Sequence, residues 1–118
     1  MKESVLRTKS YHFALEIIEV YKKLTSEQRE FVLSKQLLRS GTSIGANIEE
    51  ADGAQSKKDF LHKVSIAYKE ARETSYWLRL LKDSKYLSET DANELLQKID
   101  ELCKIMVAII KTTKQNLS

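Results

Sequence analysis

Residues 36–52 read QLLRSGTSIGANIEEAD, a segment in which small and polar residues stand between isoleucines. A plain amphipathic helix would carry more leucine at these positions. Gly41 and Gly45 are four residues apart and so share one helical face, where each glycine costs up to about 1 kcal/mol relative to alanine. Either the helix breaks at Ser40-Gly41-Thr42, or a neighbouring helix approaches closely at that face. The four-residue spacing favours the close approach.

The same segment carries polar side chains that need partners if they are buried. Ser43 and Asn47 are four residues apart and Glu50 follows three later, so all three lie on one helical face. We predict an interhelical polar network that sets the register between the second and third helices. Its expected members are Arg39, Ser43, Asn47, Glu50 and Glu73. The alternatives are a ligand or partner site on these residues, and catalysis by Asn47, Glu50 and Glu73.

Apolar residues recur every three or four positions in four segments of the chain, which is the period of an amphipathic helix. The connections between these segments are short and polar, so consecutive helices are expected to run antiparallel. The sequence therefore predicts an all-α, antiparallel up-down four-helix bundle, formed by a single domain over residues 1–118. Its helices are expected at about residues 10–24, 27–53, 57–83 and 89–114.

Capping residues mark the expected helix ends. The predicted N-caps of the second, third and fourth helices are Thr25 or Ser26, Ser56, and Ser88. An aspartate stands three residues after each of the last two serines, as in a capping box. Gly53 is expected near the C-cap of the second helix.

Composition narrows the class of protein. The chain has 118 residues with no proline and only three glycines, which argues against a turn-rich all-β fold. The net charge of +3 is too small to argue nucleic-acid binding by itself. Residues 1–10 lack the apolar stretch of a signal peptide, and no run approaches the ~20 apolar residues that span a bilayer. We expect a cytoplasmic protein with no membrane contact.

Patterns typical of catalytic or metal sites are missing from the sequence. The carboxylate pairs Glu49/Glu50 and Glu70/Glu73 lack the following histidine of a di-iron Glu-x-x-His motif. Cys103, the only cysteine, stands among apolar residues, where thiols are usually inert. The two glycines of the second helix are not followed by the Lys-Ser/Thr of a phosphate-binding loop. We predict no metal, no cofactor, no catalytic residue and no enzymatic activity.

Basic residues are concentrated in the third helical segment. Residues 55–87 carry eight Lys or Arg against four Asp or Glu, together with Tyr68, Tyr76 and Trp77. One interpretation is an ordinary solvated face; the other is a basic strip that meets phosphates or an acidic partner. The candidate contact residues are Lys57, Lys58, Lys63, Lys69, Arg72 and Arg79.

A spaced motif is formed by Leu38-Arg39, Ser43-Ile44, Asn47-Ile48 and Glu50. Further matching positions are Ser56-Lys57-Lys58-Asp59-Phe60, Ile66-Ala67, Glu70-Ala71-Arg72-Glu73-Thr74 and Trp77-Leu78, with Phe13-Ala14 and Tyr21 in the first helix. From about Tyr11 to Ile110 the chain resembles the small bacterial four-helix-bundle proteins encoded by intervening sequences in 23S rRNA genes. It departs at Ser40, where the family often has a second arginine, and at Ala51, where it commonly has glycine.

The resemblance implies a four-helix bundle that forms a ring-like homo-oligomer, expected to be a pentamer. The accessory protein of diversity-generating retroelements shares this fold, assembles in that way, and binds nucleic acid and its reverse transcriptase. No catalytic residues carry over from the family. We therefore expect a non-enzymatic oligomeric adaptor associated with RNA or DNA; the alternative is a protein-binding scaffold with no nucleic-acid contact.

Overall fold

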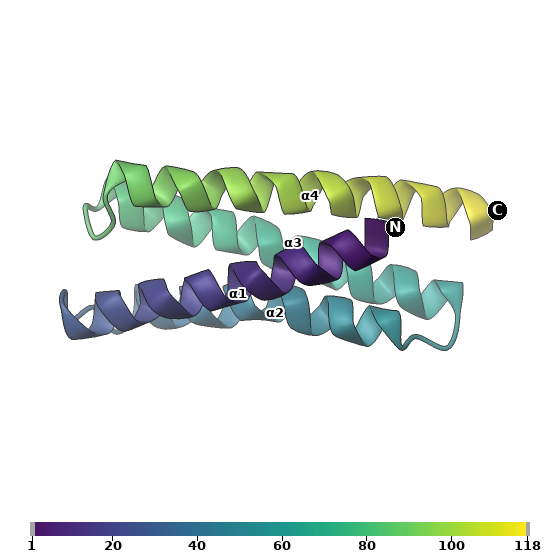
Figure 1. Cartoon of the computed structure of the whole chain (residues 1–118), viewed down its shortest axis with the longest axis horizontal. Coiled ribbons are helices and arrows are strands. Elements are labelled where there is room, and N and C mark those ends of the chain that lie inside the picture. Colours follow the sequence, from purple (N-terminus) through teal and green to yellow (C-terminus); the bar gives the residue numbers. More distant parts are fainter. Residues whose placement is uncertain (1, 118) are drawn as a thin grey trace.

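A computed structural model describes residues 2–117 and shows four helices and no strand among them. The helices are α1 (Lys2–Ser26), α2 (Leu33–Asp52), α3 (Lys57–Asp83) and α4 (Glu89–Leu117). They run alternately up and down along the long axis of a molecule that measures 49 × 21 × 20 Å (Figure 1). The predicted all-α, up-down four-helix bundle is confirmed. None of the described helices is long and apolar enough to cross a membrane.

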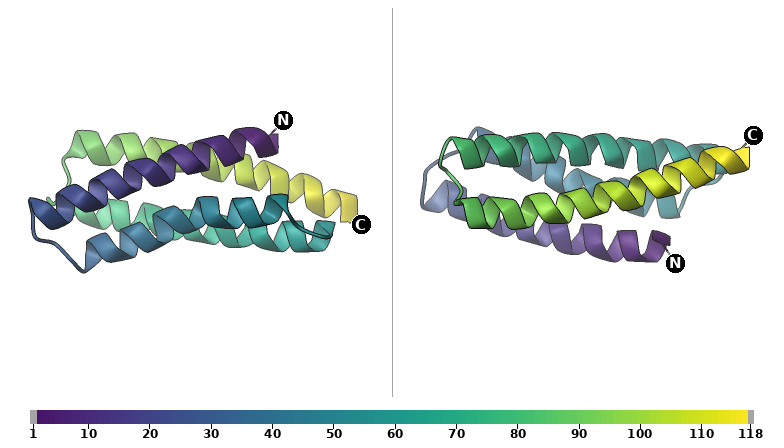
Figure 2. Two further views of the ribbon diagram at one scale, coloured as in Figure 1. Left: turned by 60° about the horizontal axis from the view of Figure 1, so that its bottom comes forward. Right: turned by 90° about the horizontal axis from the view of Figure 1, so that it is seen from above.

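Each helix packs against its neighbours in the order α1–α2–α3–α4, and α4 closes the bundle against α1 (Figure 2). One continuous apolar core runs through all four helices. Its largest fully buried side chains include Phe13 and Ile17 of α1, Ile44 of α2, Leu78 of α3 and Met106 of α4. Burial of this kind contributes roughly 1.5–3 kcal/mol for each large apolar side chain.

The first and fourth helices are longer than predicted. The first helix begins at Lys2 instead of about residue 10, because Leu6 extends the apolar stripe by two turns and is only 1% exposed. The fourth helix continues to Leu117 instead of about residue 114. The third helix has the predicted bounds, and its cap is confirmed because the Asp59 N–H donates to Ser56 Oγ at 3.0 Å.

The predicted start of the second helix was wrong. Thr25 and Ser26 belong to the last turn of α1, where their hydroxyl groups donate to backbone carbonyls of the preceding turn. The chain then reverses, and α2 begins only at Leu33. Phe31, expected inside the helix, lies in the connection and is 54% exposed.

The N-terminus of α2 is capped by Glu30, whose carboxylate stands before the helix. It accepts hydrogen bonds from the N–H groups of Val32 (3.1 Å), Leu33 (3.0 Å) and Ser34 (2.7 Å). Partial burial acts to raise the pKa of Glu30, but these hydrogen bonds outweigh it and lower the pKa below its usual value. An anion at this position also complements the positive end of the helix dipole.

The helix is continuous through Gly41 and Gly45, so the predicted close approach is confirmed and a break is excluded. The neighbour is α1. A methyl group added at Gly41 would stand 2.9 Å from two side-chain carbons of Ile17, which is fully buried. At Gly45 the nearest atom would be the Ser10 carbonyl oxygen, at an ordinary contact distance of 3.4 Å. The contact at Gly41 is therefore the tighter of the two.

This difference predicts opposite effects of two matched substitutions. We expect Gly41→Ala to destabilise the protein by about 1–2 kcal/mol, because overpacking in a core costs about 1–3 kcal/mol and exceeds the gain in helix propensity. Gly45→Ala should be neutral or stabilising by up to about 1 kcal/mol. Urea unfolding followed by circular dichroism measures both values. Equal effects of the two variants would contradict the assignment of the close contact to Gly41.

The Glu30 cap predicts a pH-dependent contribution to stability. Because the pKa of Glu30 is lowered on folding, its contribution is present above the unfolded-state pKa of about 4.3 and is lost as the pH falls through the folded-state value. We expect Glu30→Gln to cost roughly 1 kcal/mol at pH 7 and less at about pH 3. Glu27→Gln, in the same connection, is the control and should show no such change. A cost for Glu30→Gln that is the same at both pH values would disprove this role.

Candidate functional site

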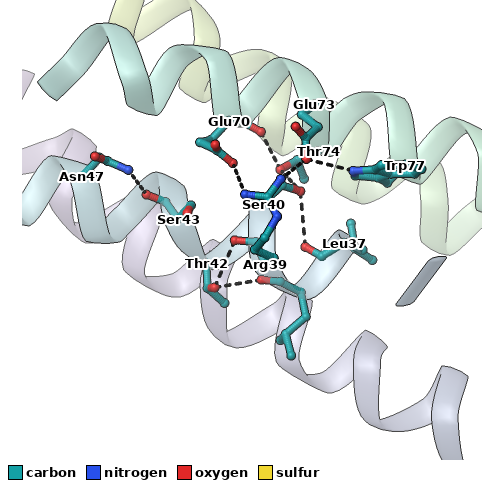
Figure 3. A network of polar contacts seen from close by, with 11 residues as sticks. Leu37, Arg39, Ser40, Thr42, Ser43, Asn47, Glu70, Glu73, Thr74 and Trp77 are labelled. Carbon is teal, nitrogen blue, oxygen red and sulfur yellow. Dashed lines mark hydrogen bonds and ion pairs between the residues drawn. The ribbon is translucent and has the colours of Figure 1, made fainter. Parts of the chain in front are cut away.

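A pair of buried hydroxyl groups joins α2 to α3 in the interior of the bundle (Figure 3). Thr74 Oγ1 and Ser40 Oγ lie 2.9 Å apart, and both residues are fully buried. The Thr74 hydroxyl also lies 2.7 Å from the Glu70 carbonyl oxygen, to which it can donate its single proton. With the Ser40 hydroxyl then donating to Thr74, both groups are satisfied. This contact links one turn of α2 to one turn of α3 and so fixes their register.

A second contact between these helices lies at the surface. The Arg39 guanidinium pairs with Glu70 Oε2 at 3.3 Å and with the carboxylate of Glu73. Trp77 Nε1 donates to the same Glu73 oxygen at 3.2 Å (Figure 3). The Arg39 side chain is 52% exposed, whereas that of Glu70 is 19% exposed. Arg39 therefore gathers both carboxylates of this stretch of α3 on the side that faces α2.

The other members of the predicted network do not join this contact. The Asn47 side-chain amide donates to the backbone carbonyl of Ser43 at 2.9 Å, within α2. Glu50 pairs with Lys63 at 2.7 Å, further along the groove between α2 and α3. The five predicted residues thus take part in three separate contacts. Only Arg39 and Glu73 are paired with each other across the two helices.

The buried pair that links the helices was missed by sequence reasoning. In the sequence, Thr74 stands out only as part of a motif shared with the family, and Ser40 only in a possible helix break and as a departure from the family pattern. The sequence carries one sign of this pair. Each of the two polar side chains stands at a core position, with apolar residues one turn before and after it. Ser40 lies three residues after Leu37 and four before Ile44, both of which are buried.

The catalytic alternative required Asn47, Glu50 and Glu73 to act together. Each instead has its own partner. Asn47 donates to a backbone carbonyl and Glu50 pairs with Lys63. Glu73 accepts from both Arg39 and Trp77. In the part of the chain that the structure describes, no three His, Cys, Asp or Glu side chains lie close enough to hold a metal ion. The Cys103 thiol is half-buried, and burial is the main reason why its pKa is raised. The thiol therefore stays protonated and weakly nucleophilic.

Four of the candidate basic residues share the outer face of α3. Lys58, Arg72 and Arg79 stand at intervals of seven or fourteen residues, and Lys69 lies three before Arg72, so their side chains point to one side. All four are exposed. At about 1.5 Å per residue, the row from Lys58 to Arg79 is about 31 Å long. We call these four residues the outer basic row.

The other two candidates lie elsewhere. Lys63 faces α2, where its hydrogen bond to Glu50 raises the pKa of the amine. Lys57 borders a shallow hollow at the end of the bundle, next to Phe60 and Ile109. Neither belongs to the outer basic row.

The outer basic row has no carboxylate partners among residues 2–117. The carboxylates of α3 that are nearest to Lys69 and Arg72, Glu70 and Glu73, turn toward α2 and are held by Arg39. Asp59 and Asp83 also lie on α3, but neither forms an ion pair with the row. Arg72 contacts the Tyr68 hydroxyl at 3.4 Å, and Arg79 lies over the ring of Tyr76. The charges of the row are therefore left available to a partner of opposite sign.

Fold and contacts together define a class: an all-α bundle whose second helix packs on the first through glycine and on the third through a buried hydroxyl pair. Residues 2–108 match the family model of the 23S rRNA-intervening sequence protein. The chain belongs to this family, as the resemblance in the second and third helices predicted.

A solved structure supports the same assignment. It is the crystal structure of a protein of unknown function from the S23 ribosomal protein family of Bacteroides thetaiotaomicron VPI-5482. The two chains are 50% identical and superpose with a TM-score of 0.93, over 94% of this chain and 99% of that one. No curated protein matches the sequence.

Proposed function

We propose that this protein is a non-enzymatic adaptor that binds nucleic acid through the outer face of α3. The observation that carries the proposal is the outer basic row of Lys58, Lys69, Arg72 and Arg79. Four cations along about 31 Å of one helix, without ion-pair partners among the described residues, are opposite in sign to the charges of a phosphate backbone and can contact several of them. The modest net charge of +3 does not oppose this, because binding depends on the local arrangement of charge.

Phosphate contacts of this kind release counterions, so binding should weaken steeply with salt. Four contacts to a single strand correspond to a slope of about −3 in log K against log salt, or about a 50-fold loss between 50 and 200 mM. Replacement of all four residues of the outer basic row by glutamine should abolish most of this slope. The matched control replaces four exposed lysines on other helices, Lys23, Lys35, Lys104 and Lys111, by glutamine and should retain most of the binding.

Gel retardation and fluorescence anisotropy with labelled RNA provide the measurement. The proposal is wrong if the wild-type protein fails to bind RNA even at ~50 mM salt. It is equally wrong if the two quadruple variants lose affinity to the same extent, because binding would then follow total charge and not the outer face of α3.

We also propose that the protein works as a homo-oligomer, and the family resemblance suggests a pentamer. Exposed apolar side chains support self-association: Tyr11 and Leu15 lie four residues apart on α1, and both project outside the core. Static light scattering at micromolar concentration should give a multiple of the 13.6 kDa chain mass, with five copies expected. Leu15→Glu should lower that mass. A particle of 13.6 kDa would contradict the assembly.

A second candidate is a protein-binding scaffold with no nucleic-acid contact. The observation in its favour is the connection between α1 and α2, where Phe31 and Val32 are 54% and 71% exposed. Two adjacent large apolar side chains outside the core are typical of contact with another protein. A specific partner that stays bound after nuclease treatment and is lost with Phe31→Ala would favour this candidate.

A further inference from the structure

Tyr76 lies on the outer face of α3, in the C-terminal third of the helix, and does not contribute to the core. It stands four residues after Arg72 and three before Arg79, so the three side chains share one side of the helix. The tyrosine is 48% exposed. The Arg79 guanidinium carbon lies 5.8 Å from the centre of its ring. An exposed aromatic ring therefore stands between two exposed cations.

The ring is held in place by a chain of contacts that begins in α2. Arg39 pairs with Glu73, Glu73 accepts a hydrogen bond from Trp77 Nε1 at 3.2 Å, and the Trp77 ring meets Tyr76 edge to face. The two ring centres are 5.2 Å apart with planes inclined at 68°. A ring whose neighbours are fixed in this way loses little freedom when a ligand binds on it.

We infer that the ligand of this face is single-stranded nucleic acid, one base of which stacks on Tyr76 while its flanking phosphates pair with Arg72 and Arg79. The inference rests on the proposed function and names the form of nucleic acid that the face selects. Aromatic side chains interleaved with cations bind single strands, because an unpaired base can leave its own stack and lie on the ring. In a duplex the bases are stacked on one another and present only their edges.

The spacing suits one nucleotide. Arg72 and Arg79 are seven residues apart, or about 10.5 Å along the helix axis, and both side chains are long enough to close on a ligand between them. Each guanidinium can bind a phosphate with two parallel hydrogen bonds, and Arg79 can do so while it remains in contact with an aromatic face. The outer basic row lies along one side of a single helix, so it can follow one backbone.

The test compares a fluorescein-labelled single-stranded RNA of about 20 nucleotides with the same sequence in a duplex, using the full chain at ~50 mM salt. We expect the single strand to bind more tightly. Tyr76→Ala should weaken single-strand binding by about 5-fold to 100-fold, the range of one lost base stack. Tyr76→Phe and Tyr76→Trp should retain it. Tyr86→Ala, which removes another exposed tyrosine of the chain, is the matched control and should change nothing.

Glu73→Ala tests the positioning contact. It removes the acceptor that holds Trp77, so it should weaken single-strand binding only when Tyr76 is present. In the Tyr76→Ala background, Glu73→Ala should have no further effect on single-strand affinity. Thermal unfolding of each variant separates a loss of fold from a loss of contact.

Two results would overturn the inference while leaving the proposed function intact: unchanged single-strand affinity in Tyr76→Ala, or equal affinity for the duplex with the same salt slope. The absence of binding to either RNA would overturn both the inference and the proposed function.

Discussion

The close contact between α1 and α2 at Gly41 is the constraint on which the rest of the structure depends. With no side chain at that position, Ile17 packs directly on the α2 backbone, and the two helices approach to a distance that alanine would not allow. This contact sets the rotation of α2 about its own axis. The neighbouring position, Ser40, is thereby turned toward α3, where it meets Thr74. One glycine thus orients the helix for both of its interfaces.

The rotation of α2 also sorts the charges of α3. Arg39 reaches the groove between the two helices and draws Glu70 and Glu73 to it, and Glu50 draws in Lys63 in the same way. Such half-exposed ion pairs contribute little to stability, about 0–1 kcal/mol each. Their larger effect is on the surface, because Glu70 and Glu73 are occupied on the side that faces α2, whereas Lys58, Lys69, Arg72 and Arg79 remain on the outer face with Asp83 as their one acidic neighbour on α3. A helix of mixed charge therefore presents a basic outer face.

Much of the fold was predictable because it depends on local patterns. The four helices follow from the spacing of apolar residues, and α3 has the predicted ends because a serine cap and a polar run lie next to the stripe they terminate. The start of α2 was not predictable in this way. Its cap is a glutamate that reaches three N–H groups only after the chain has reversed, so the nearer Thr25 and Ser26 were taken for the cap. The early start of α1 was missed because Leu6 stands among mostly polar residues, apart from the apolar stripe that begins at Phe13.

The candidate site shows where sequence reasoning ends. Spacing indicated that Gly41 and Gly45 share a face and favoured the close approach of another helix. The resemblance of the motifs indicated the family, and composition indicated that the third helix is basic. Which helix approaches the glycines, and which polar side chains of α2 face α3, was decided by the packing. Ser43, Asn47 and Glu50 do share a face of α2, yet the buried hydroxyl pair is formed by Ser40 and Thr74. The period of a helix relates residues within that helix, whereas the direction in which each face points depends on how closely all four helices fit together.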